Sequence, residues 1–261
     1  MTRRRFFAPP GAFNFNQQTV TLTADEARHL REVLRLKPGD EVSVFDGEGR
    51  EFRAMVVQAR RESAELELKD EIAPARPESP LQITLAVALL KGEKFDLVVQ
   101  KATELGVTRI LPVITERADV RLRDSGDGAK RVARWQRIAL EAAKQSGRAR
   151  VPGIAQPIVC KSLMEPSAAE NAESFAPSKT LCLMFAECDG RFLTEAIKDL
   201  PGRARKITAL VGSEGGWTDE EIFRAREAEW KIVTLSGRTL RAETAAICVA
   251  ALLQHLFGDL F

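Results

Sequence analysis

The sequence predicts an α/β protein in which a small antiparallel β domain precedes a larger domain built on a mostly parallel sheet. Apolar and polar residues alternate with a period of two in the first 72 residues, prolines recur at every third position of 73–80, and apolar segments then alternate with helical patterns. We therefore expect an N-terminal β-barrel domain at 1–72, a proline-rich linker at 73–80 and an α/β domain at 81–261. The 261 residues, of which 44% are hydrophobic, suffice for a core in each domain.

Three segments of the first domain carry the strand pattern. They are EVSVFD (41–46), EFRAMVVQA (51–59) and SAELELKD (63–70), and a glycine-containing turn separates the first two. One helix is expected around 24–36. Small β-barrels often carry RNA, but a fold alone does not assign a function.

The second domain begins with a buried strand, LQITLAVALL (81–90), and VTRILPVI (107–114) predicts the next. Between them, apolar residues recur at helical spacing up to Gly106, a typical helix end. Another helix is expected at 131–146. Further strands are predicted by TLCLMFAE (180–187), ITALVGS (207–213) and KIVTLS (231–236).

Two glycine-bearing loops follow predicted strands, at 212–216 and 236–238. Ligands of open parallel sheets bind at the carboxyl ends of the strands, so the functional site is expected there. The polar, small-residue stretch 166–178 predicts a mobile surface insertion instead.

Composition excludes several classes of protein. The longest apolar run, 245–253, is much shorter than the roughly 20 residues of a membrane span, and no apolar segment follows the basic start MTRRRFF. The four cysteines form no CxxC pair, and the two histidines lie far apart in the sequence, so neither a disulfide framework nor a metal site is expected. We expect a cytoplasmic protein with reduced thiols.

The net charge of +2 is unevenly distributed. Residues 121–150 contain nine lysines and arginines against three acidic residues, and residues 1–37 contain seven against three. Any single run could be an ordinary solvated face, but two basic segments favour a polyanionic partner such as RNA.

The segment GSEGG (212–216) raises the question of its ligand. A capping box at Thr218 and Glu221 follows, so the glycines could merely turn a strand into a helix, although one glycine would suffice for that. The lysine of a Walker A loop is missing. A phosphate would also face four carboxylates, those of Glu214 and 219–221. S-adenosylmethionine, a cation without phosphate, fits better, because backbone groups exposed by glycines can read its adenine.

GSEGG, together with TLSGRTLRAETAA (234–246), resembles the paired cofactor motifs of the 16S ribosomal RNA uridine-N3 methyltransferases of the SPOUT superfamily. RRFFAP near the start, HLREVLRLKPGD (29–40), KGEKFDLVVQKATELGV (91–107) and EAAKQSGRARVP (141–152) are similar to other landmarks of that family, so the resemblance covers nearly the whole chain. The family usually has proline at the position of Ser213 and glycine at that of Ser236, and both departures bear on loop shape.

The resemblance implies a trefoil-knotted methyltransferase domain, a PUA-like N-terminal β-barrel that binds RNA, and a homodimer. It implies 16S rRNA, within the small ribosomal subunit, as the partner, and S-adenosylmethionine as the cofactor. The residues expected to bind the cofactor are Phe185, Val211, Gly212, Glu214, Gly215, Gly216, Leu235, Ser236, Gly237, Leu240 and Thr244.

Methylation of uridine N3 sets its own chemical requirements. N3 carries a proton and lies on the Watson–Crick edge, so the enzyme must expose the base, align it and assist loss of the proton. Glu243 is the candidate proton acceptor, and Arg241 the candidate group that stabilises charge on the uracil oxygens. Glu243 could instead complement a helix dipole and pair with Arg241.

For RNA, the expected contacts are basic and polar residues of both domains. Arg31 and Arg35 are expected on one face of the first helix. The full set is Arg4, His29, Arg31, Arg35, Lys91, Lys94, Lys101, Gln145 and Arg148, each of which could singly be an ordinary surface residue.

Three alternatives to the uridine-N3 reaction remain open. The same fold could methylate a ribose 2′-hydroxyl or act on transfer RNA. The chain could also be an RNA-binding assembly factor without turnover, in which case intact cofactor motifs would be unexpected. A phosphate-binding enzyme is disfavoured by the carboxylates.

Overall fold

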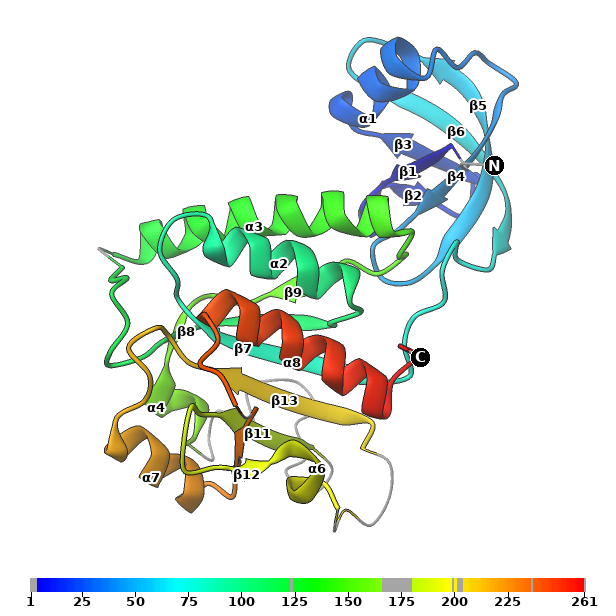
Figure 1. Cartoon of the computed structure of the whole chain (residues 1–261). Coiled ribbons are helices and arrows are strands. Elements are labelled where there is room, and N and C mark those ends of the chain that lie inside the picture. The colour runs from blue at the N-terminus through cyan, green and yellow to red at the C-terminus, as the bar shows by residue number, and fades with distance from the viewer. Residues whose placement is uncertain are drawn as a thin grey trace. The chain divides into compact units, whose positions relative to one another are not determined.

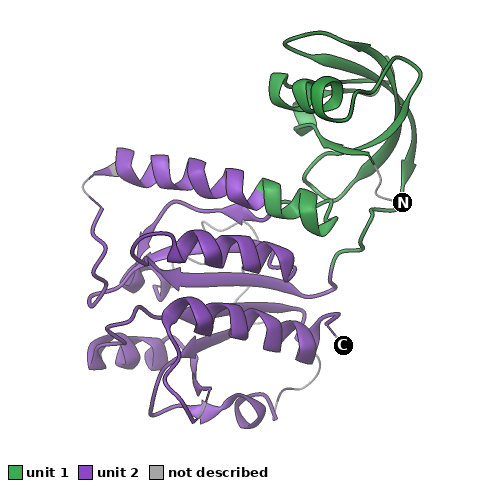
Figure 2. Cartoon of the chain, turned by 45° about the horizontal axis from the view of Figure 1, so that its top comes forward, with its two compact units in different colours: residues 1–78, 140–151 green, residues 79–139, 152–261 purple. Residues whose placement is uncertain are grey.

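A computed structural model describes residues 4–122, 124–165, 180–198, 200, 204–235 and 237–260. The predicted insertion at 166–178 lies outside these residues. The chain divides into two compact units (Figure 2): Met1–Glu78 with Leu140–Val151, and Ser79–Ala139 with Pro152–Phe261. Residues 140–151, which the sequence places after the linker, thus belong to the N-terminal unit.

The N-terminal unit is a curved sheet whose described strands follow the order β1-β4-β5-β6-β3-β2. Its pairs are antiparallel except for β1 with β4. The strands are β1 (Arg5–Phe7), β2 (Phe13–Asn14), β3 (Thr19–Leu22), β4 (Glu41–Phe45), β5 (Glu51–Ala59) and β6 (Ala64–Ile72), with a 3-10 turn η1 (Pro10–Ala12). Alternate residues of β5 and β6 point into a core that includes Phe6, Leu22, Leu30 and Leu66, which confirms the predicted period of two.

The predicted helix at 24–36 is shorter and less regular than expected. It consists of α1 (Ala24–Arg28) and a π-helical turn η2 (His29–Val33). A π turn has more residues per turn than an α-helix, which alters the spacing on its faces. Arg35 lies beyond the helix with φ at 53°. The expectation that Arg31 and Arg35 share one helical face is therefore wrong.

The second unit is an open parallel sheet, as predicted. Its described strands follow the order β10-β8-β7-β13-β11-β14-β12, with β9 also paired to β8, and all of these pairs are parallel. The strands are β7 (Gln82–Ala88), β8 (Arg109–Ile114), β9 (Gly153–Ile154), β10 (Ile158–Val159), β11 (Leu181–Phe185), β12 (Arg191–Phe192), β13 (Lys206–Val211) and β14 (Lys231–Thr234).

Helices cover both faces of this sheet (Figure 1). On one face α2 (Lys94–Glu104) packs beside α8 (Ala242–Phe257), and α4 (Cys160–Leu163) and α7 (Asp219–Glu227) pack on the other. A short helix α6 (Leu193–Ala196) follows β12, and α3 (Ser125–Ser146) begins six residues before the predicted start at 131. No helix in the described part of the chain has the length and apolarity needed to cross a bilayer.

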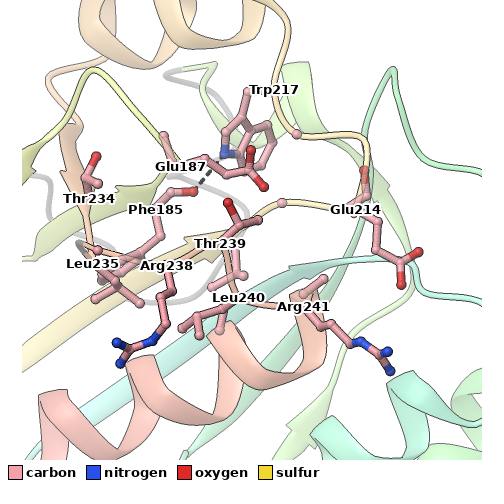
Figure 3. A pocket seen from close by; sticks show the side chains of 18 residues that line it. Phe185, Glu187, Glu214, Trp217, Thr234, Leu235, Arg238, Thr239, Leu240 and Arg241 are labelled. Atoms are coloured by element: carbon pink, nitrogen blue, oxygen red, sulfur yellow. Dashed lines mark hydrogen bonds between the residues drawn. The ribbon is translucent and has the colours of Figure 1, made fainter.

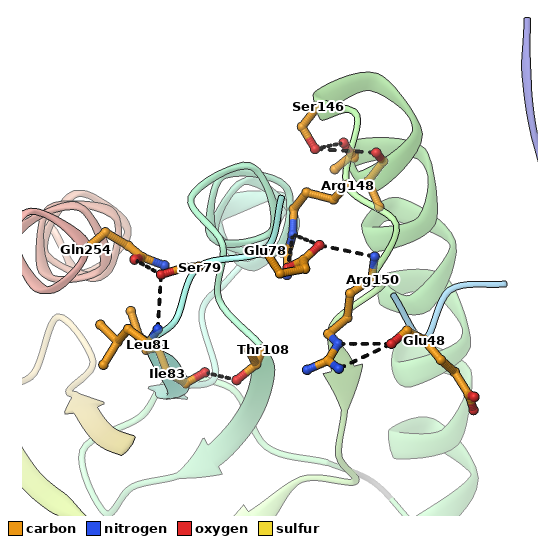
Figure 4. Close-up of polar contacts among 12 residues, drawn as sticks. Glu48, Glu78, Ser79, Leu81, Ile83, Thr108, Ser146, Arg148, Arg150 and Gln254 are labelled. Atoms are coloured by element: carbon orange, nitrogen blue, oxygen red, sulfur yellow. Dashed lines mark hydrogen bonds and ion pairs between the residues drawn. The ribbon is translucent and has the colours of Figure 1, made fainter. Parts of the chain in front are cut away.

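Each unit contains a buried polar contact that ties distant segments together (Figure 4). In the second unit, Ser79 Oγ donates to Gln254 Oε1 over 2.7 Å. In the N-terminal unit, the guanidinium of Arg148 donates from Nε and Nη2 to Glu78, and the backbone N–H of Arg150 donates to the same carboxylate. The side chain of Arg148 is only 6% exposed, and the ion pair with Glu78 holds its guanidinium in place.

We expect Arg148→Ala to lower the free energy of unfolding by about 3 kcal/mol, because removing one partner of a buried ion pair leaves the other uncompensated. Glu78 keeps 21% of its side chain exposed, which places the loss at the lower end of the usual range. Urea denaturation followed by circular dichroism measures it. Gln145→Ala, at an exposed position three residues before Arg148, is the control and should change stability by less than about 0.5 kcal/mol. Equal stability of both variants would contradict a structural role for Arg148.

Candidate cofactor site

Three neighbouring strands of the parallel sheet end at the same level. Phe185, the last residue of β11, pairs with Val211 at the end of β13 on one side and with Val233 of β14 on the other. The chain segments that follow these strands therefore emerge side by side at one edge of the sheet, where ligands of parallel sheets bind. Both glycine loops predicted as the site belong to this group.

The loop after β13 is built around Trp217. Its indole Nε1 donates to the backbone oxygen of Phe185 over 2.8 Å (Figure 3), and the ring is almost fully buried. The ring packs directly on Gly212, where a Cβ atom would approach it to 2.9 Å. Gly216 provides a second constraint, with φ at 67°, a conformation that favours glycine. The packing of Trp217 thus explains the glycine at position 212, and the positive φ explains the glycine at position 216.

The start of α7 is fixed by the predicted capping box. The hydroxyl of Thr218 accepts from the backbone N–H of Glu221, and the Glu221 carboxylate accepts from the N–H of Thr218. The second oxygen of that carboxylate accepts from the N–H of Glu116, which follows β8. Glu221 therefore joins two loops at the carboxyl edge of the sheet.

These segments enclose a cavity of about 460 Å³. That volume lies within the range of small-molecule sites. Its lining comes from the ends of β11, β13 and β14, from the glycine loop and from the segment leading into α8 (Figure 3): Phe185, Ala186, Glu187, Val211, Gly212, Ser213, Glu214, Gly216, Trp217, Thr234, Leu235, Gly237, Arg238, Thr239, Leu240, Arg241, Ala242 and Ala245.

The charges of the lining are balanced. Two carboxylates, those of Glu187 and Glu214, accompany two guanidiniums, those of Arg238 and Arg241. The acidic residues in the first turn of α7, at 219–221, do not line the cavity. The sequence argument that a phosphate would face four carboxylates therefore holds for only one of them.

Glu214 has a cationic partner from another element. Lys94, the first residue of α2, donates a hydrogen bond to its carboxylate. This hydrogen bond is the main cause that raises the pKa of Lys94, and the charges of Glu214 and Glu243 add to it while that of Arg241 opposes it. Lys94, Glu214, Arg241 and Glu243 thus form one cluster of alternating charge beside the cavity.

Most of the residues predicted to bind a cofactor line this cavity. They are Phe185, Val211, Gly212, Glu214, Gly216, Leu235, Gly237 and Leu240. Gly215 and Thr244 do not line it, and Ser236 lies outside the described residues. Gly215 instead allows a close approach of Arg117, whose backbone oxygen would lie 2.7 Å from a Cβ atom there.

The two candidate catalytic residues occupy different positions. Arg241 is exposed and lines the cavity, whereas Glu243 is buried in the first turn of α8 and does not line it. One carboxylate oxygen of Glu243 has no hydrogen-bond partner among the described residues. Sequence reasoning missed Trp217 and Arg238, although a bulky aromatic directly after three glycines was a usable signal.

The residues predicted to contact RNA differ in exposure and in whether a neighbouring residue already pairs with them. Arg35 and Gln145 are exposed. Three of the predicted contacts form ion pairs: Arg4 with Asp40, Lys91 with Asp119, and Lys101 with Glu104. Arg31 donates a hydrogen bond to the backbone oxygen of Arg60. The ring of His29 packs edge-on against Phe6. Among the described residues, no group of three or more His, Cys, Asp or Glu side chains could hold a metal ion.

Two protein-family models match this chain, and both describe RNA methyltransferases. The family model of an RNA methyltransferase domain matches residues 77–254, and that of an RNA methyltransferase PUA domain matches residues 22–69. The first model covers more than half of the chain and contains the entire cavity. The chain therefore belongs to this family of PUA-containing RNA methyltransferases, and its fold is of the predicted SPOUT type.

The individual proteins that are similar to this chain include ribosomal RNA methyltransferases. The chain is 35% identical to a ribosomal RNA small subunit methyltransferase E from Synechocystis, over 92% of this chain and 74% of that protein. The crystal structure of a ribosomal RNA small subunit methyltransferase E from Neisseria gonorrhoeae, bound to S-adenosylmethionine, is 36% identical with a TM-score of 0.83 over 99% of this chain and 100% of that one. A Legionella pneumophila protein in complex with the same cofactor is 30% identical, with a TM-score of 0.82 and coverage of 99% and 100%.

We expect Gly212→Ala to disturb the cavity through Trp217, because the added methyl group would collide with the indole. Overpacking of this kind costs about 1–3 kcal/mol of stability. The tryptophan fluorescence should also shift as the indole loses its hydrogen bond to Phe185. Gly153→Ala is the control, since this glycine has open space around it, no positive φ and no place in the cavity lining. An unchanged fluorescence spectrum of Gly212→Ala would contradict this role of the glycine.

Proposed function

We propose that this protein transfers the methyl group of S-adenosylmethionine to N3 of a uridine in 16S ribosomal RNA. The observation that carries the proposal is the cavity at the ends of β11, β13 and β14, because residues of both GSEGG (212–216) and TLSGRTLRAETAA (234–246) line it. Two of the relatives reported above are named as methyltransferases of small-subunit ribosomal RNA. The substrate of this chain is proposed to be that RNA within the small ribosomal subunit, in the cytoplasm.

The lining fits S-adenosylmethionine chemically. When bound, this cofactor supplies an electrophilic methyl group on a cationic sulfur. Backbone groups at the strand ends and at Gly212 are accessible to an adenine, and Leu235 and Leu240 supply apolar surface. Glu214 and Glu187 provide negative charge for the cationic end. Lys94 would hold Glu214 in place rather than contact the RNA backbone.

Arg241 and Glu243 are proposed to act on the uracil base. Arg241 lines the cavity and would stabilise negative charge on the uracil oxygens as N3 loses its proton. An unpaired buried carboxylate oxygen is costly, and it is tolerated where a partner arrives with the substrate. This supports Glu243 as the group that accepts the N3 proton.

A direct assay tests the reaction. The protein is incubated with labelled S-adenosylmethionine and either unmethylated small subunits or naked 16S RNA, and the digested nucleosides are identified by mass spectrometry. The label is expected in 3-methyluridine. Label in a 2′-O-methylated nucleoside would overturn the chemistry, and no label with either substrate would overturn the function.

The protein is also proposed to act as a homodimer. Leu97 on α2 and Leu252 on α8 are about 40% exposed on two helices that pack side by side, which supports an apolar contact with a second copy. Sedimentation equilibrium should then give twice the mass of one chain. A single-chain mass at micromolar concentration would contradict the dimer.

We expect Glu243→Gln to lower kcat by about 100- to 10,000-fold, the usual contribution of a general base, while the Kd for S-adenosylmethionine stays within twofold. Asp219→Asn is the control, because Asp219 also lies in the first turn of a helix but is exposed, whereas Glu243 is buried. If both variants keep full activity, Glu243 only complements the helix dipole.

We expect Arg35→Ala to weaken RNA binding at every sequence tested and to reduce the slope of log K against log salt by about one, because one phosphate contact is lost. The affinity for S-adenosylmethionine should not change. Filter binding over a range of salt concentrations measures the first effect and calorimetry the second. Arg28→Ala, which removes an exposed arginine already paired with Asp25, is the control. Equal loss of both affinities would contradict separate RNA and cofactor sites.

A further inference from the structure

The N-terminal unit carries an aromatic cluster that the proposed reaction does not use. Phe15, at the tip of the hairpin between β2 and β3, is 52% exposed. Its ring stacks on Phe13 with centroids 5.8 Å apart and an interplanar angle of 17°, and Phe52 of β5 lies 5.7 Å away. The base of the cluster is buried and its outer ring faces solvent.

The hairpin that presents Phe15 is held in shape by its own side chains. Asn14 Oδ1 accepts from the backbone N–H of Gln17, and Asn14 Nδ2 donates to Gln17 Oε1. The backbone oxygen of Gln18 accepts from the N–H of Leu68 on β6 over 2.7 Å. The exposed ring therefore sits on an ordered turn, which limits the entropy lost when a ligand covers it.

A guanidinium lies over the same rings. The Cζ atom of Arg50 is 5.1 Å from the centroid of Phe15 and 4.8 Å from that of Phe52. Both Nε and Nη2 of Arg50 donate to Glu71 Oε2, so the carboxylate holds the guanidinium by its edge. Arg50, Phe13, Phe15 and Phe52 together are called the Phe15 platform below.

A second ion pair nearby, Arg53 with Asp70, can be compared directly with Arg50 and Glu71. Arg53 pairs with Asp70, and the exposed fractions are 47% and 48%, against 48% for Arg50 and 54% for Glu71. Arg53 on β5 and Arg50, one residue before β5, are therefore equally exposed, and each pairs with a carboxylate of β6. Of the two, only Arg50 lies over aromatic rings of the described residues. A solvated ion pair alone does not require that arrangement.

The surroundings of the platform favour a base over a phosphate. The hydrogen bond that Arg50 donates to Glu71 is the largest cause that raises the pKa of Arg50, and the charges of Glu71, Asp46 and Glu48 raise it further. Acidic groups this close would repel an RNA phosphate. The flat faces of phenylalanine and guanidinium are instead surfaces on which an unpaired nucleobase stacks.

We propose that the Phe15 platform binds an unpaired nucleobase of the RNA substrate by stacking. The proposal rests on the proposed function for the identity of the RNA. It assigns the platform a different task from that of Arg35: the platform selects single-stranded RNA, and the arginine contributes charge.

Two RNA probes test the platform, an unstructured RNA of about 20 nucleotides, longer than common single-strand site sizes, and a fully paired duplex containing the same strand. Phe15→Ala is expected to weaken binding of the unstructured RNA by about 5- to 100-fold, the loss of one stacked base. The salt dependence of binding should not change, since no phosphate contact is removed. Binding of the duplex should also stay the same.

Graded substitutions separate stacking from simple burial. Phe15→Trp should retain or strengthen binding, whereas Phe15→Leu, which keeps apolar bulk without a π face, should lose most of it. Arg50→Ala should weaken binding while Arg53→Ala should not. Phe223→Ala is a further control, because Phe223 is equally exposed, at 58%, on α7 of the other unit. Thermal unfolding of each variant excludes misfolding.

Several results would overturn the proposal. Unchanged affinity of Phe15→Ala for the unstructured RNA would do so, as would equal losses for Phe15→Ala and Phe223→Ala. A loss seen only with assembled small subunits would assign the platform to a protein partner instead. Methyl transfer by the wild-type protein is measured in parallel. If the wild-type protein transfers no methyl group but the platform variants lose RNA affinity, the platform is supported and the proposed reaction is not. If the wild-type protein transfers the methyl group but the platform variants keep their RNA affinity, only the platform is refuted.

Discussion

The candidate site depends on the register of three parallel strands. Phe185 is paired on both sides, with Val211 and with Val233, so β11, β13 and β14 end together. Backbone hydrogen bonds set this register, and shifting one strand by a residue would turn its side chains to the opposite face. The two glycine-bearing loops, which are separated by a helix and a strand in the sequence, therefore face each other across one cavity.

Around that cavity, charge is balanced locally. Glu214 is neutralised by Lys94 from α2, and Glu221 turns away to cap α7 and to hold the N–H of Glu116. The lining itself carries two carboxylates and two guanidiniums, which suits a ligand that carries both positive and negative charge. Lys94, which the sequence associates with RNA, is paired in the structure with Glu214 of the glycine loop after β13.

The N-terminal unit carries two features that we propose contact RNA in different ways. Arg35 is an exposed charge that follows the π turn, whereas the Phe15 platform offers flat surfaces beside acidic groups. Charge supplies affinity for any RNA, and stacking distinguishes unpaired bases from a helix. A methyltransferase that must reach the Watson–Crick edge of a base gains from both, because its target has to be unpaired.

Local patterns in the sequence determined the parts of this protein that depend on neighbouring residues. The alternation in β5 and β6, the parallel strands, the capping box at Thr218 and the glycine loop were all predicted from the sequence. Eight predicted cofactor residues, such as Phe185 and Leu240, line the cavity. Only the tertiary structure decided the contacts between distant segments. Arg148 is buried against Glu78, Trp217 packs on Gly212, and Arg50 lies over Phe15 because folding brings together segments whose separation in the sequence says nothing about distance in space.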